Sequence, residues 1–167
     1  MESCIPSLRR YGWSLTRDHQ DVDDLVHDCL VRALERLHTR RETGDLRPWL
    51  FAIMHNLFVS RVRQAKRRGR LEAMDEVSEA HFAQPPTQEV RAETQRVWDA
   101  LHALPPEQRS VLVLICVEDL SYADAARVLN IPIGTVMSRV SRARERLARL
   151  MASGTIDAVA GDRRREE

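Results

Sequence analysis

Arginine and hydroxyl side chains gather in two segments whose spacing suits nucleic-acid binding. Residues 61–70 contain six cations and no acidic residue, and residues 134–146 interleave serines with arginines. An arginine can bind a guanine edge or a phosphate through two parallel hydrogen bonds, and a serine can hydrogen-bond to either. These segments therefore predict contacts with nucleic acid, and the alternative for each alone is a solvated, charged helix face.

Nothing in the sequence predicts catalysis or a metal site. It contains no phosphate-binding glycine loop and no Ser-His-Asp order, and its six histidines are scattered. Aspartates near residue 24 could serve as metal ligands in a nuclease or recombinase, but Asp24 and Asp28 share one helix face while Asp21 is expected to cap the helix. We therefore expect no enzyme, no catalytic or metal-ligating residues and no cofactor.

The composition indicates a globular protein that stays where it is made. The chain has 167 residues, 43% of them hydrophobic, and its formal net charge of +1 is strongly segregated along the sequence. No apolar run is long enough for a signal peptide or a membrane span, which predicts a cytoplasmic protein without membrane insertion. Cys4, Cys29 and Cys116 are too widely spaced for a zinc site, and the last two are expected in the core.

The spacing of apolar residues predicts an all-α fold, because no segment alternates convincingly as a strand does. A short helix is expected from Ser7 to Leu15. A longer helix is expected from Asp21 to His38, with a capping-box-like start at Asp21 and Asp24. Its apolar stripe has three-and-four spacing and consists of Val22, Leu25, Val26, Cys29, Leu30, Ala33, Leu34 and Leu37.

A third helix is expected to begin at Arg47-Pro48, because proline suits the first helical position, and to run into the basic segment. Trp49 is expected in the core of this region rather than as a platform for stacking bases. Helical order fades after the basic segment and resumes at about Thr94. The expected organisation is an N-terminal helical domain, a flexible linker, a C-terminal helical domain and a polar tail, over residues 1–70, 71–93, 94–152 and 153–167.

A helix-turn-helix is predicted between residues 121 and 150. Ser121 and Asp124 form a capping box for a short helix, and Asn130 can adopt the left-handed conformation that ends it. The opposite face of the second helix carries serines and arginines, which suits a major groove. An ordinary helical hairpin with a charged surface is the alternative. The apolar residues of the second helix repeat at spacings of four and three, namely Val136, Val140, Ala143, Leu147 and Leu150.

The chain contains five motifs in a fixed order, spanning about residues 5 to 150. They are Asp24-Leu25-Val26-His27-Asp28, Pro48-Trp49-Leu50-Phe51-Ala52-Ile53-Met54-His55-Asn56-Leu57, Leu104-Pro105-Pro106-Glu107-Gln108-Arg109, Leu120-Ser121-Tyr122-Ala123-Asp124-Ala125-Ala126 and Gly134-Thr135-Val136-Met137-Ser138-Arg139-Val140-Ser141-Arg142-Ala143-Arg144. Together these motifs resemble an extracytoplasmic-function sigma factor, the two-domain type of the sigma-70 family of bacterial RNA polymerase. Each motif alone is weakly specific, whereas five in the family's order are strong evidence.

The resemblance implies an alternative sigma factor that directs promoter-specific initiation in a stress or signal response. It implies two helical domains, the second carrying a helix-turn-helix of the winged-helix-like DNA-binding class. The acidic-faced helix would dock on the coiled-coil of the largest polymerase subunit, and the flap of core polymerase is a further implied contact. The residues implied at or near the core contact are Asp24, His27, Asp28 and Arg32, although the family more often has glutamine where this chain has His27.

The resemblance also implies two DNA contacts. The third helix would open the minus-ten element and hold its non-template strand through Asn56, Arg61, Arg63, Arg67 and Arg68. The helix-turn-helix would read the minus-thirty-five element through Thr135, Met137, Ser138, Arg139, Ser141, Arg142 and Arg144. Relatives often carry aspartate in place of Ser60, and basic or aromatic residues in place of Met137 and Ser141. The promoter sequence is therefore not predictable from the family.

The implied partners are core RNA polymerase, promoter DNA and an anti-sigma factor, and the free chain is expected to be a monomer. A stand-alone helix-turn-helix regulator remains the alternative. Such a regulator would explain residues 94–150. A stand-alone regulator would not account for the acidic-faced helix or the basic third helix. This alternative predicts specific duplex binding without polymerase.

Overall fold

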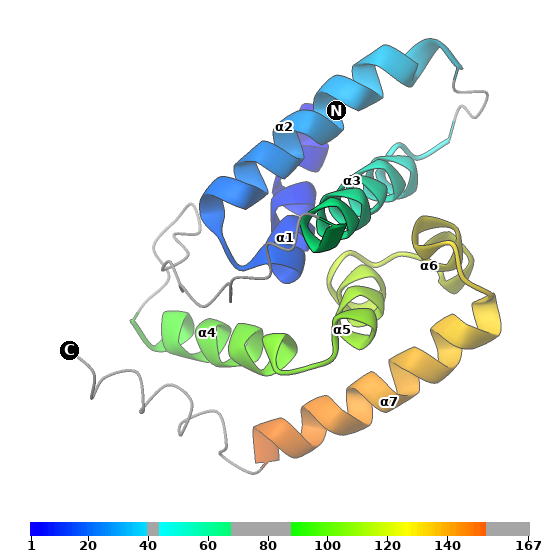
Figure 1. Ribbon diagram of the computed structural model, residues 1–167. Coiled ribbons are helices and arrows are strands. Elements are labelled where there is room, and N and C mark those ends of the chain that lie inside the picture. The colour runs from blue at the N-terminus through cyan, green and yellow to red at the C-terminus, as the bar shows by residue number, and fades with distance from the viewer. Residues whose placement is uncertain (40–43, 68–87, 153–167) are drawn as a thin grey trace.

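The computed structural model describes residues 1–39, 44–67 and 88–152 (Figure 1). The predicted tail over 153–167 lies outside the described residues, as does the predicted linker up to residue 87. The side chains of residues 39, 66 and 88–93 also lie outside the described part of the chain.

Every regular element in the described ranges is a helix, which confirms the all-α prediction. The N-terminal half consists of α1 (Ile5–Thr16), α2 (His19–Arg36) and α3 (Arg47–Arg67), with short 3-10 turns at Glu2–Cys4 and Leu37–Thr39. The C-terminal half consists of α4 (Gln88–His102), α5 (Pro106–Leu112), α6 (Tyr122–Leu129) and α7 (Ile133–Ala152). A π-helical turn, η3 (Val113–Val117), continues α5. Figure 1 shows α1 to α3 in the upper half of the view and α4 to α7 below them.

Besides α1, which begins at Ile5 rather than Ser7, two helices begin earlier than predicted. The N-cap of α2 is Asp18, whose carboxylate accepts a hydrogen bond from the backbone N–H of Asp21 at 2.9 Å. The sequence offers two overlapping acidic pairs at capping spacing, and the upstream pair, Asp18 with Asp21, is the one used. The other early helix is α4, which begins at Gln88 rather than at about Thr94. The residues from Gln88 to Glu93 include only two apolar residues, Val90 and Ala92, which are too few to show a helical period in the sequence.

The helix-turn-helix forms as predicted. The Ser121 hydroxyl accepts a hydrogen bond from the backbone N–H of Asp124 at 3.0 Å, which starts α6. Asn130 ends α6 with a φ of 52°, in the left-handed region. Its neighbour Ile131 donates a backbone hydrogen bond to the carbonyl of Ala126 at 3.1 Å. The turn thus supplies a donor to a carbonyl in the last turn of α6 before α7 begins at Ile133.

Replacing Asn130 with alanine is expected to lower the free energy of unfolding by about 1 kcal/mol, because the left-handed conformation brings a Cβ close to the following carbonyl. Asparagine tolerates this conformation through its short polar side chain, and glycine tolerates it without a Cβ. Chemical denaturation followed by circular dichroism would measure the change, and Asn130→Gly is the matched control. An alanine variant as stable as the wild type would contradict the role of this cap.

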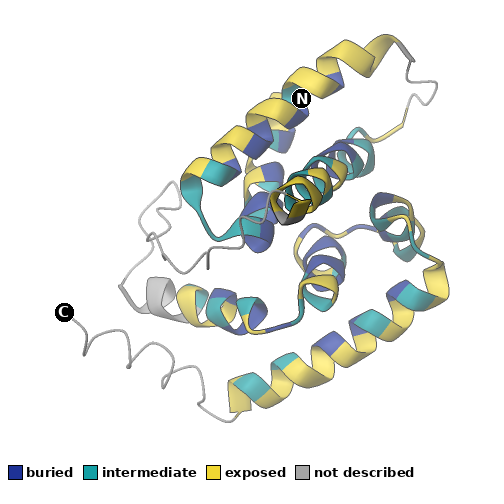
Figure 2. Cartoon of the chain, in the orientation of Figure 1, coloured by how far each residue is buried: buried dark blue, intermediate teal, exposed yellow. Residues whose placement is uncertain are grey.

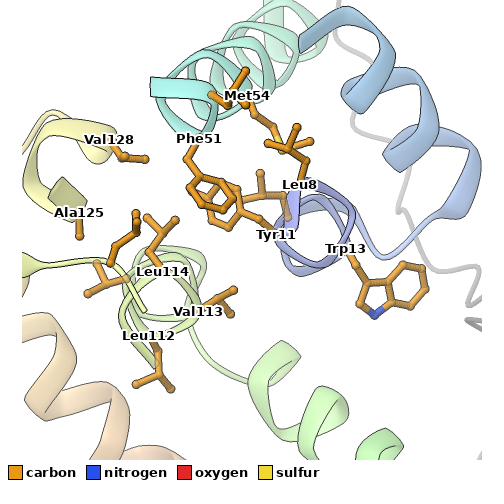
Figure 3. Close-up of a cluster of buried hydrophobic side chains, with 14 of the residues drawn as sticks. Leu8, Tyr11, Trp13, Phe51, Met54, Leu112, Val113, Leu114, Ala125 and Val128 are labelled. Carbon is orange, nitrogen blue, oxygen red and sulfur yellow. The ribbon is translucent and has the colours of Figure 1, made fainter. Parts of the chain in front are cut away.

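The buried residues of the two halves form one continuous core. α3 packs on α6, and α1 packs on α5. Figure 3 shows Tyr11 and Phe51 from the N-terminal half facing Leu114, Ala125 and Val128 from the C-terminal half. All five are buried, and the rings of Tyr11 and Phe51 meet edge to face with centroids 5.3 Å apart. The sequence predicts two helical domains, and the structure adds that they close on each other.

Three apolar positions lie elsewhere than predicted. Leu34 and Leu37 are 61% and 41% exposed, so the apolar stripe of α2 is buried only over its first part. The last turns of α2 extend past the helices that cover its earlier turns. Cys29 is buried as expected, but Cys116 is exposed because the π turn changes the phase of the helix that carries it. Trp49 is half-buried and packs on the core, as predicted.

Two histidines, one in each half, are largely withdrawn from solvent. His55 of α3 pairs through Nδ1 with the Tyr11 hydroxyl at 2.9 Å, and burial lowers its pKa from 6.5 to about 4. Burial and the nearby cations of Arg109 and Arg17 lower the pKa of His102 to about 3. Both imidazoles are therefore neutral in the folded chain at neutral pH.

Acidification is expected to destabilise the fold through these histidines. Below about pH 6.5 the unfolded chain binds protons that the folded chain does not, so their contribution is complete above that pH and is lost as the pH falls toward 4. Between pH 7 and 5.5 the free energy of unfolding should fall by about 1 kcal/mol per histidine. Urea denaturation at both pH values would measure this. His55→Gln should reduce the dependence, with His27→Gln on exposed α2 as the control, and an unchanged dependence would contradict the assignment.

Candidate nucleic-acid interface

The acidic side of α2 faces solvent. Asp24, His27, Asp28 and Arg32 are all exposed, whereas Val22, Leu25, Val26 and Cys29 on the opposite side are buried. The three- and four-residue spacing places the exposed residues along one side of the helix. In Figure 2 exposed residues recur along the whole of α2, alternating with buried ones. The structure thus brings together the four residues that the resemblance associates with core polymerase.

An ion pair joins this acidic surface to the basic end of α3. The guanidinium Nη2 of Arg61 lies 2.6 Å from Oδ2 of Asp28. The resemblance assigns these two residues to different partners, and in the free chain they are paired with each other. Any partner that takes the carboxylate of Asp28 therefore releases the cation of Arg61.

The basic end of α3 projects away from the core. Asn56, Arg63 and Arg67 are exposed and Arg61 is half-buried, while Arg68 lies outside the described residues. The Ser60 hydroxyl donates to the backbone carbonyl of Asn56 at 2.8 Å, so the helix itself satisfies this hydroxyl. These residues continue one helix whose first turns are anchored in the core by Leu50, Phe51 and Met54. A rigid support of this kind can present cations to a phosphate backbone.

The serine-arginine face of α7 is exposed, as the sequence predicts. Val136, Val140 and Ala143 are buried against the rest of the C-terminal half. On the other side Met137 is 53% exposed, and Ser138, Ser141, Arg142 and Arg144 are exposed as well. Thr135 and Arg139 are half-buried at the edge of this face. Hydroxyl, thioether and guanidinium groups on one side of a helix are the groups that read base edges in a major groove.

Several contacts orient the residues of α7. The Ser138 hydroxyl donates to the backbone carbonyl of Thr135 at 3.1 Å, and the Ser141 hydroxyl lies 3.5 Å from Oε1 of Glu145. Arg144 donates to Sγ of Cys116 at 3.5 Å, which ties the end of the face to η3. The two serines are thus held by their own helix and would have to exchange these bonds to contact DNA.

The surface of α2 also has an apolar part that its sequence pattern did not predict. Val31 and Leu34 on α2, and Leu37 in the 3-10 turn that follows, are exposed, with 42%, 61% and 41% of their surface accessible. Ile133, at the start of α7, is also 45% exposed. A signal was present for Val31, because it follows Asp24 by seven residues and Asp28 by three and so shares their side of the helix. Exposed large apolar residues in a group indicate a protein-binding surface.

The described residues hold no group of three or more His, Cys, Asp or Glu side chains that could bind a metal ion. No helix in the described ranges is long and apolar enough to cross a bilayer.

Comparison with known proteins matches the two halves to two family models. Residues 1–55 match the Sigma2 domain of PhyR, and residues 94–147 match Sigma-70, region 4. Over 149 residues the chain is 37% identical to the ECF RNA polymerase sigma factor EcfG of Rhodopseudomonas palustris. That alignment covers 89% of this chain and 81% of the relative, so it includes both halves in the same order.

Solved structures agree with this likeness. The fold is similar to the sigma factor RpoE of Bartonella quintana in complex with the anti-sigma factor NepR, with a TM-score of 0.75, 35% identity and coverage of 90% of this chain and 93% of that chain. It is also similar to CnrH in complex with the cytosolic domain of CnrY, with a TM-score of 0.66, 28% identity and coverage of 91% and 84%.

Proposed function

This chain belongs to the extracytoplasmic-function sigma factors of the sigma-70 family, non-enzymatic proteins that direct transcription initiation by RNA polymerase, and on that basis we propose which of its surfaces bind each partner. The N-terminal half binds core polymerase and the melted minus-ten element. The C-terminal half binds the minus-thirty-five element as duplex. The observation that carries this division is the exposure of an acidic-apolar surface on α2 and of a serine-arginine face on α7, one in each half.

Core polymerase binds the exposed side of α2. Asp24, His27, Asp28 and Arg32 supply charge there, and the exposed Val31 and Leu34 supply apolar area beside it. A surface with apolar residues among charges is typical of protein interfaces. The partner surface is the coiled-coil of the largest polymerase subunit, as the family resemblance implies. The flap of core polymerase is a further contact.

The opened minus-ten strand binds the basic end of α3. Single-stranded DNA is a flexible polyanion with exposed bases, and it is held by a cationic surface with a few polar groups. Asn56, Arg61, Arg63 and Arg67 provide such a surface, and Arg68 follows them in the sequence. The ion pair of Arg61 with Asp28 suggests that core binding and strand binding are coupled, because a partner on Asp28 frees the guanidinium.

The minus-thirty-five duplex binds α7 in its major groove. Thr135 and Arg139 lie at the edge of the contact, and Arg144 lies toward η3. The residues that face the groove most directly are Met137, Ser138, Ser141 and Arg142. Serine can bond to any base, whereas arginine prefers guanine or phosphate, so most of the sequence preference is expected from Arg142.

An anti-sigma factor of the NepR kind binds this chain when it is inactive. The support is the likeness to the Bartonella quintana sigma factor solved with NepR, and the match of residues 1–55 to the Sigma2 domain of PhyR. The close agreement over 90% of this chain indicates that the folded shape described here is one that such an inhibitor can hold.

In vitro transcription tests this proposal. Purified core polymerase, this protein and a pool of genomic promoter fragments would be combined, and the start sites mapped by sequencing the transcripts. We expect discrete start sites that share upstream sequences and disappear when the protein is omitted. Specific duplex binding without core binding or initiation would instead identify a stand-alone helix-turn-helix regulator.

A further inference from the structure

Glu118 is a buried carboxylate held by two arginines from the other half of the chain. Its side chain is fully buried. Arg10 of α1 donates from Nε to Oε1 at 2.8 Å and from Nη2 to Oε2 at 3.0 Å. Arg47, at the start of α3, lies with Nη2 3.5 Å from Oε2 and also donates to the backbone carbonyl of Glu118. The partners are 108 and 71 residues away in sequence.

Both sides of this cluster are set in place by local structure. Glu118 follows η3, and its backbone N–H bonds to the carbonyl of Val113 at 3.0 Å. The next residue, Asp119, has a φ of 54°, which turns the chain sharply toward α6. On the other side the Ser7 hydroxyl accepts a hydrogen bond from Arg10 at 3.0 Å. The charges therefore meet only when the two halves adopt the closed arrangement.

The closed arrangement is too small to reach both promoter elements. The minus-ten and minus-thirty-five elements are about 25 base pairs apart, which is roughly 85 Å along B-DNA at 3.4 Å per base pair. In the closed chain α3 packs directly on α6, the helix that precedes α7. The 20 residues of α7 themselves extend only about 30 Å. For α3 and α7 to bind their elements together, the two halves have to separate.

We propose that the cluster of Glu118, Arg10 and Arg47 is a latch that holds the free chain closed and has to break before both halves engage a promoter. This inference rests on the proposed function, because the need to open follows from the two promoter contacts. Burying a carboxylate costs desolvation free energy, and this cost remains when one of the paired cations is lost. The closed arrangement is therefore favourable only when both arginines pair with the carboxylate. The apolar contact of Phe51 with the C-terminal half also stabilises the closed arrangement, and the latch fixes the orientation of the two halves relative to each other.

Distance measurement in the free protein tests whether the latch exists. Spin labels at Ser60→Cys and Ala148→Cys, both exposed, would report the separation of α3 and α7 by electron double resonance in a Cys116→Ser background. Glu118→Gln and Arg10→Ala are expected to raise the open fraction relative to the closed one by about tenfold, the effect of losing a charge-assisted hydrogen bond. Matched controls are Glu107→Gln, exposed on α5, and Arg9→Ala, whose ion pair with Asp23 lies within the N-terminal half.

Initiation kinetics test whether the latch restrains activity. With core polymerase and a cognate promoter, the latch variants should form open complexes up to about tenfold faster at limiting protein, because a larger fraction is competent. An unchanged label distance in both variants, with the fold intact by circular dichroism, would overturn the latch. Opening without any change in initiation rate would overturn its regulatory role. If the wild type and the variants all fail to initiate, the proposed function fails, while the distances still decide whether the latch exists.

Discussion

Reversing Asp24 and Asp28 to lysine is expected to lower the affinity for core polymerase by roughly 100-fold or more and to abolish initiation at ordinary protein concentrations. Both carboxylates are exposed on the side of α2 proposed to dock. A lysine at these positions removes the attraction to the partner's cations and adds repulsion between like charges. The repulsion at an interface costs several kcal/mol. Fluorescence anisotropy with labelled protein and core polymerase would measure the affinity, and run-off transcription would measure the outcome.

The controls separate docking from folding. Asp23→Lys makes the same change on the same helix, at an exposed residue that pairs with Arg9 of α1 and is not among the residues proposed to bind core polymerase. Asp24→Lys alone leaves the pair of Asp28 with Arg61 intact and should give a smaller loss in the same direction. If Asp23→Lys weakened core binding as much as the double reversal, the docking surface would have been assigned to the wrong side of α2.

Replacing Arg142 with alanine is expected to weaken binding to the minus-thirty-five element by roughly 5-fold to 150-fold, since a good bidentate contact contributes about 1–3 kcal/mol. The guanidinium is exposed in the middle of the serine-arginine face of α7, one turn after Ser138. Binding of the holoenzyme to its selected promoter, and to versions with single substitutions in the upstream element, would be measured at fixed salt.

The pattern of losses distinguishes two kinds of contact. If Arg142 reads a base, the alanine variant loses discrimination at that base pair, whereas a phosphate contact weakens all sequences alike and lowers the salt dependence. Arg149→Ala is the matched control, because it is exposed two turns later on the same helix. Equal losses from both substitutions would indicate general attraction to DNA rather than a recognition contact.

Local sequence patterns were sufficient to predict most of the secondary structure and the composition of each candidate surface. Caps act over three or four residues, so Ser121, Asp124 and Asn130 identify the ends of α6 without reference to the rest of the chain. The periodicity of α7 likewise separates buried Val136 and Val140 from exposed Ser138 and Arg142. Where two caps competed, as at Asp18 and Asp21, the local pattern did not decide between them.

Apolar periodicity failed where burial depends on the neighbours of a helix. Leu34 and Leu37 continue the stripe of α2, yet they are exposed because the helix extends beyond its packing partners. Cys116 is exposed because a π turn changes the phase of its helix, and no local residue pattern predicts that turn. A helix pattern states which side is apolar, and the tertiary fold decides how much of that side is covered.

The family, the two helical halves, the helix-turn-helix and the exposed side of α7 proposed to read DNA could all be inferred from residues close to one another in sequence. The closure of the two halves could not. Glu118 meets Arg10 across 108 residues, and Asp28 meets Arg61 across 33. Such pairs depend on how the helices pack in three dimensions, and many pairings of the same charges are compatible with the same helical pattern. Only the tertiary structure selects one, because burial makes an unpaired charge costly.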